Sequence, residues 1–113
     1  MRNIIKNFVA ILKVEIEDLS ADIELLIAEC QKKKDAGIIT DYVYMENIAL
    51  YRHELLAVQS FARLLEQTEP DRFEKLDDLV AYLSDAFRAG GYVRAINICI
   101  ERKMNKVTRY VTQ

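Results

Sequence analysis

The chain has 113 residues, of which 51% are hydrophobic and 30% are charged, with three glycines and one proline. This length and composition predict a single globular domain over residues 1–113, and the scarcity of Gly and Pro favours long helices. The formal net charge of -2 and a pI near 5.4 exclude a general electrostatic attraction to nucleic acid or to an anionic membrane.

The first residues resemble a leader peptide only in placing a basic residue before apolar ones. Lys6 and Lys13 leave six uncharged residues between them, too few for the apolar part of a leader and far too few to cross a bilayer. Cys30 and Cys99 are far apart and match no metal or redox motif, so we expect buried free thiols, with a disulfide or redox pair as the alternative. We therefore expect a cytoplasmic protein without membrane contact.

The clearest periodic signal lies in the first third of the chain. Two apolar rows recur there every seven residues: Ile5, Leu12, Leu19 and Leu26, and Val9, Ile16, Ile23 and Cys30. These rows predict a long helix over residues 3–35 that packs against another helix. Gly37 supplies a C-terminal stop after the three lysines at 32–34, which suit the negative end of the helix dipole.

A second helix is predicted over residues 41–67, with Thr40 or Asp41 as its N-cap. It carries two apolar rows on adjoining faces: Tyr44, Ile48, Tyr51, Leu55, Val58, Ala62 and Leu65, and Val43, Leu50, Ala57 and Leu64 with Phe61 beside them. A helix that is apolar over so much of its circumference must be covered on more than one side. We expect it at the centre of the fold, in a dimer interface, or in both.

Pro70 suits the first position of a third helix, predicted over residues 70–89 and ended by Gly90 and Gly91. A fourth helix is predicted over residues 92–111. Each is about 20 residues or 30 Å long, so neither covers the first two helices along their whole length. The sequence therefore predicts an all-α fold: an antiparallel four-helix bundle of two long helices followed by a shorter helical hairpin. The apolar surface left over would be buried in a homodimer.

Charged residues form two groups of interest. The third helix is mainly acidic and the fourth mainly basic, so we expect the two to be complementary neighbours. The alternative is that the basic residues of the fourth helix bind nucleic-acid phosphates: Arg94, Arg102, Lys103, Lys106 and Arg109. No interleaved aromatic residues or helix-turn-helix pattern accompany them, which argues against a nucleic-acid partner.

Acidic residues share one side of the first helix: Glu15, Asp18, Asp22 and Glu29. They form either the solvated side of a bundle helix or a docking surface for a basic partner helix. A carboxylate-bridged di-metal site in a bundle needs two Glu-x-x-His motifs, and the chain has one His. We therefore expect no metal and no cofactor.

Arg52, His53 and Glu54 lie within a predicted helix that is followed by a turn and another helix. This segment resembles the phospho-accepting histidine segment of dimerising two-component phosphotransfer domains. The resemblance implies that a neutral nitrogen of His53 accepts a phosphoryl group while Glu54 orients or deprotonates the ring. The chain departs from the family at Leu56 and Ala57, where sporulation-type members carry Asn at the second position and monomeric members carry Lys and Gly. A plain rim histidine is the alternative.

Tyr42 and Glu46 share a side of the second helix with His53 and could line a small polar pocket with it, or a solvated patch. The chain contains no glycine-rich phosphate loop and no nucleophile motif. We therefore expect a non-enzymatic interaction protein, an adaptor, chaperone-like binder or regulator, which forms a homodimer and has a possible protein partner. Histidine phosphotransfer is the alternative function, and a bundle of the bacteriocin-immunity type is an analogy in size and helix count only.

Overall fold

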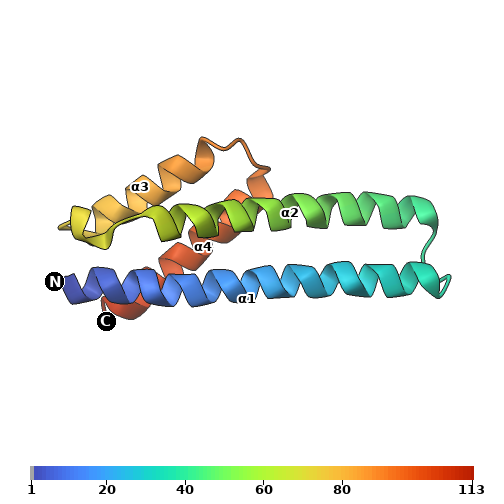
Figure 1. Cartoon of the computed structure of the whole chain (residues 1–113), viewed down its shortest axis with the longest axis horizontal. Coiled ribbons are helices and arrows are strands. Elements are labelled where there is room, and N and C mark those ends of the chain that lie inside the picture. Colours follow the sequence, from blue (N-terminus) through green and yellow to red (C-terminus); the bar gives the residue numbers. More distant parts are fainter. Residues whose placement is uncertain (1) are drawn as a thin grey trace.

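The computed structural model describes residues 2–113, with side chains from Ile4 onward. Within these residues the chain forms four α-helices, one 3₁₀ turn and no strand: α1 (Arg2–Asp35), α2 (Asp41–Gln67), η1 (Pro70–Arg72), α3 (Leu76–Arg88) and α4 (Arg94–Val111). α1 and α2 form a long antiparallel hairpin, and α3 and α4 form a shorter hairpin that lies along one half of it (Figure 1). The predicted all-α class, with two long helices followed by a shorter helical hairpin, is confirmed.

The turn between α1 and α2 closes with the expected capping residues. Gly37 has a φ of 72°, and the amides of Gly37 and Ile38 donate to the carbonyls of Lys34 and Lys33 at 3.0 and 2.9 Å. This is the Schellman pattern, which requires a left-handed residue that glycine adopts without strain. Thr40 then caps α2, because its hydroxyl oxygen accepts the amide hydrogen of Val43 at 3.2 Å.

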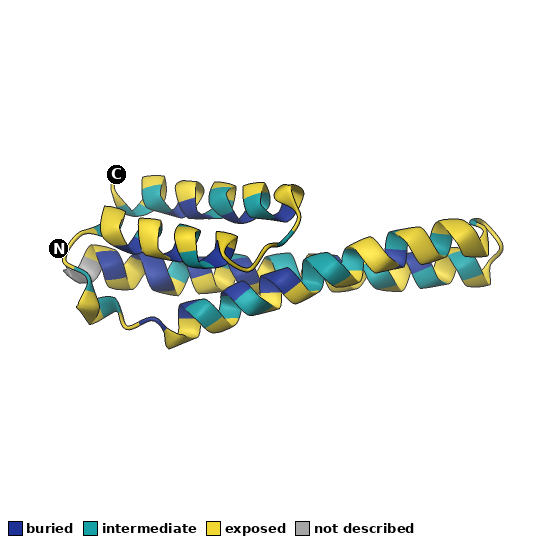
Figure 2. Cartoon of the chain, turned by 90° about the horizontal axis from the view of Figure 1, so that it is seen from above, coloured by how far each residue is buried: buried dark blue, intermediate teal, exposed yellow. Residues whose placement is uncertain are grey.

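The core lies where all four helices meet. Each helix contributes a side chain that is fully buried: Phe8 and Leu12 from α1, Phe61 from α2, Leu83 from α3 and Ile100 from α4. Dark blue residues in Figure 2 gather in this half of the molecule. Burying apolar side chains of this size stabilises the fold by about 1.5–3 kcal/mol each, so the short hairpin is held mainly by apolar packing.

The third helix does not begin at Pro70 as predicted. Pro70 opens the 3₁₀ turn η1, the chain is extended at Phe73 and Lys75, and α3 begins at Leu76. The physical reason is that Glu69, which precedes Pro70 and would have to cap a helix starting there, makes no side-chain capping hydrogen bond. Thr68 completes the end of α2, because its hydroxyl donates to the carbonyl of Leu64 at 2.7 Å.

The molecule is elongated, with extents of 54 × 25 × 21 Å. One half of the α1–α2 hairpin is covered by α3 and α4, and the other half projects beyond them (Figures 1 and 2). We call the covered half the base. We call the projecting half the arm, and define it as residues 20–35 of α1, the connecting turn and residues 41–54 of α2.

Candidate interaction surface

The apolar rows of α1 change their exposure from the base to the arm. Leu12 and Leu26 occupy the same heptad position, yet Leu12 is 0% exposed and Leu26 is 46% exposed. The other row of α1 faces α2 and stays buried along its whole length, down to Ile23 and Cys30 on the arm. Leu26 is therefore exposed because no further helix packs against it on the arm. The heptad spacing of α1 itself continues through this position.

The second apolar row of α2 behaves in the same way. Ala57 is 0% exposed and Leu64 packs against the core at the base, whereas Leu50 is 48% exposed and Val43 is 40% exposed on the arm. Seven residues are close to two helical turns, so the four side chains point to the same side of α2. The side of α2 that the short hairpin covers at the base is thus open on the arm.

A shallow groove of about 220 Å³ runs between α1 and α2 on this side of the arm. Its lining combines apolar and charged side chains: Leu25, Leu26, Glu29, Cys30, Lys33, Ile39, Asn47 and Tyr51. We call the groove together with Val43 and Leu50 the arm face. It is a surface of ordered helices with exposed leucines at regular spacing, which is typical of a site that receives another helix.

The acidic row of α1 divides between the base and the arm. Glu15 accepts a hydrogen bond from Lys106 of α4 at 2.5 Å, and Lys103 lies 3.6 Å away. The hydrogen bond from Lys106 lowers the pKa of Glu15 below its ordinary value, against the opposing effect of partial burial. The other three members of the row are exposed, and none takes part in an ion pair within the described residues: Asp18, Asp22 and Glu29.

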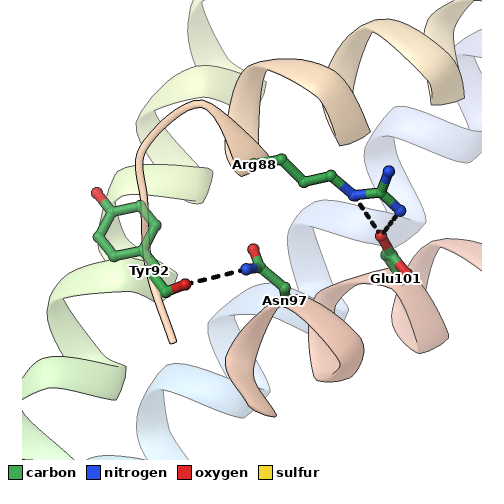
Figure 3. A network of polar contacts seen from close by, with 4 residues as sticks. All are labelled: Arg88, Tyr92, Asn97 and Glu101. Atoms are coloured by element: carbon green, nitrogen blue, oxygen red, sulfur yellow. Dashed lines mark hydrogen bonds and ion pairs between the residues drawn. The ribbon is translucent and has the colours of Figure 1, made fainter. Parts of the chain in front are cut away.

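The expected charge pairing between the third and fourth helices is wrong in detail. In the part of the chain that the structure describes, no acidic residue of α3 pairs with a basic residue of α4. The lysines of α4 reach Glu15 of α1 instead, and α3 contributes a cation, Arg88, whose Nε donates to Glu101 of α4 at 2.9 Å (Figure 3). Lys103 and Lys106 belong to the predicted basic face of α4, and they pair with Glu15 within the same chain.

The loop between α3 and α4 is fixed by a small polar network. The side-chain amide of Asn97 donates to the backbone carbonyl of Tyr92 at 3.1 Å, close to the Arg88–Glu101 pair (Figure 3). The ring of Tyr92 stacks on Phe87 with centroids 5.1 Å apart. These contacts join α3, the loop and α4 within the short hairpin.

His53 lies at the boundary of the base and the arm, where it joins α2 to the start of α4. Its Nε2 accepts the amide hydrogen of Val93 at 3.4 Å, and its ring meets Tyr92 edge-on with centroids 6.0 Å apart. Arg52 is exposed and Glu54 half-buried, and no described hydrogen bond joins Glu54 to the ring. Sequence reasoning missed this contact, since it spans 40 residues and no local motif encodes it.

The predicted polar patch of Tyr42, Glu46 and His53 is not assembled into a pocket around the histidine. Tyr42 is 69% exposed and Glu46 is exposed. Eleven residues of helix separate Tyr42 from His53, a rise of about 16 Å, so the two rings cannot touch. Tyr42 and Glu46 instead lie near the tip of the arm, beside but not within the groove.

Comparison of the chain with family models, curated proteins and solved structures gave no match. None of the helices in residues 2–113 is long and apolar enough to cross a membrane. Cys30 is buried and Cys99 half-buried, and both are free thiols. The arm face is therefore described from its geometry alone.

Proposed function

We propose that the protein is a small non-enzymatic interaction protein, an adaptor, chaperone-like binder or regulator, which binds a helical segment of a protein partner along the arm face. The observation that carries this proposal is the change of exposure within single heptad rows. Leu12 and Ala57 are buried by neighbouring helices at the base, and Leu26 and Leu50 repeat the same positions without a neighbour. Rows that accept helices at the base have the spacing to accept one on the arm.

Histidine phosphotransfer through His53 is the alternative function. That chemistry needs a ring nitrogen free to attack phosphorus, and Nε2 of His53 accepts the amide hydrogen of Val93. This contact favours the interaction role. An acid-labile phosphoryl group on the wild-type protein but not on His53→Gln, after incubation with phosphoramidate, would favour phosphotransfer.

The test of the proposed function is affinity capture with the full chain as bait, followed by mass spectrometry. The test variants are Leu26→Glu and Leu50→Glu, which place a charge on the arm face. We expect a protein that the wild type retains and both variants lose, and a second copy of the chain with a different tag counts among the possible partners. Because both leucines are about half exposed, the variants should fold with stabilities within about 0.5 kcal/mol of wild type.

Leu56→Glu is the matched control, because Leu56 is 55% exposed on α2 and lies about 120° around the helix from Leu50, away from the arm face. The control should retain the partner. The proposed function is wrong if Leu26→Glu and Leu50→Glu leave every association of the protein, with itself or with another chain, unchanged. It is also wrong if Leu56→Glu abolishes the association to the same extent.

A further inference from the structure

We propose that the arm of a second copy of the chain occupies the arm face, with the two arms packed antiparallel. This inference rests on the proposed function, because it names the partner for the same surface. It is carried by two observations: the way α3 and α4 limit access to the α1–α2 hairpin, and the distribution of charge along α1.

The short hairpin limits how a second copy can approach. α4 contacts both α1 and α2 at the base, so a partner can use this side only on the arm. If two copies packed with their arms parallel, their α3–α4 hairpins would lie against each other and keep the arms apart. With the arms antiparallel, each short hairpin meets the tip of the other arm instead of the other short hairpin. Two helices from each copy then form a central four-helix bundle, the arrangement that buries such rows in bundles.

Charge along α1 is complementary to itself in this antiparallel arrangement. From Glu15 to Glu29, α1 carries six acidic residues and no basic one, and the tip then carries lysines at 32–34. A twofold axis near Ile27 places Asp22 of one copy opposite Lys33 of the other, since both are equally distant from a point between residues 27 and 28. Asp22 is exposed, Lys33 lines the groove, and neither has an ion-pair partner within the described chain.

The chain already contains an example of this pairing. At the base, Glu15 of the same acidic row takes up Lys103 and Lys106 from α4. On the arm, Asp22 would form an ion pair with Lys33 of the second copy, and the twofold axis would produce two such pairs in the dimer. Leu25 and Leu26 lie within three residues of the proposed axis, so the apolar centre of the interface would be flanked by the two ion pairs. Such an arrangement fixes register and orientation.

The experiment is a charge exchange followed by light scattering of the full chain. Asp22→Lys alone brings two lysines together at each contact, and Lys33→Glu alone brings two carboxylates together. We expect each variant to weaken self-association by at least about tenfold in Kd, because like charges face each other. Mixed in equal amounts, the two variants restore opposite charges at both contacts, so we expect a heterodimer from two preparations that are monomeric separately.

The control is Glu24→Lys, since Glu24 is exposed two residues from Asp22 and lies on the side of α1 away from the groove; this variant should still dimerise. Circular dichroism checks that each variant is helical. A wild-type monomer at all concentrations, or a dimer that neither charge reversal weakens, would overturn the inference. A wild-type monomer that still captures another protein through Leu26 and Leu50 would overturn it while leaving the proposed function intact.

Discussion

Glu15 accepts a hydrogen bond from the ammonium group of Lys106 at 2.5 Å, and this ion pair joins the first helix to the last. Lys103 lies on the other side of the same carboxylate at 3.6 Å. The Lys106 ammonium is largely exposed and the Glu15 carboxylate is mostly covered. A pair in such a position contributes about 0.5–1 kcal/mol to the free energy of unfolding.

The pH dependence of stability should reveal this pair. Because the hydrogen bond from Lys106 lowers the pKa of Glu15 from 4.5 in the folded chain, its stabilising contribution is complete above pH 4.5. It is lost as the pH falls through the lowered folded value. Urea unfolding of wild type and Glu15→Gln should differ by about 0.5–1 kcal/mol at pH 7, and the difference should be smaller at about pH 3. A difference that is the same at both pH values would contradict the assignment.

Truncation of two leucines in the same heptad row should have very different effects on stability. Leu12→Ala removes a fully buried side chain from the core and should lower the free energy of unfolding by about 3 kcal/mol. Leu26→Ala removes a side chain that is nearly half exposed and should cost less than about 1 kcal/mol. Chemical denaturation, at protein concentrations low enough to keep the chain monomeric, measures both. Equal costs would show that the arm is covered within the monomer.

The close approach of Gly90 to Tyr92 makes position 90 sensitive to any side chain. A Cβ at Gly90 would lie 2.5 Å from Cε2 of Tyr92, and Tyr92 is held by stacking on Phe87. Gly90→Ala should therefore displace the ring and destabilise the fold by about 1–2 kcal/mol. The control is the same substitution in a Tyr92→Ala background, where thermal unfolding should show a smaller cost. An equal cost in both backgrounds would mean that the backbone, rather than the ring, excludes alanine.

The contact between His53 and Val93 predicts a structural effect of replacing the histidine. His53→Phe removes the acceptor of the Val93 amide and should lower the free energy of unfolding by about 0.5–1.5 kcal/mol. His53→Gln can place its side-chain oxygen near the position of Nε2 and should recover part of this loss. Hydrogen exchange at the Val93 amide is the direct readout. If the Val93 amide exchanges at the same rate in His53→Phe as in wild type, the ring of His53 does not protect this amide and the assigned hydrogen bond is wrong.

Much of the fold could be predicted because its signals are local. The heptad rows of α1, the glycine stop at Gly37 and the cap at Thr40 depend on residues within a few turns of each other, and the helix bounds of α1 and α2 follow from them. The start of α3 could not be predicted in the same way. Pro70 suits the first position of a helix, but Glu69 provides no side-chain cap before it and only a 3₁₀ turn forms there.

The contacts that define the site depend on how the two hairpins cross, and spacing alone does not encode this. Sequence spacing places the acidic row of α1 on one side of the helix, yet only the fold shows that Glu15 belongs to the α4 contact and that Asp22 lies on the arm. The exposed leucines of the arm follow from the unequal helix lengths, which the sequence did indicate.

Hydrogen exchange measured by mass spectrometry over an about hundredfold range of protein concentration tests the central claim, that the arm face is an association surface. We expect backbone amides in residues 20–35 and 41–54 to exchange more slowly as the concentration rises, while amides of α3 and the base remain unchanged. The same arm residues should become protected when a captured partner is added. Protection confined to α3 and α4, with no change on the arm under either condition, would contradict the account.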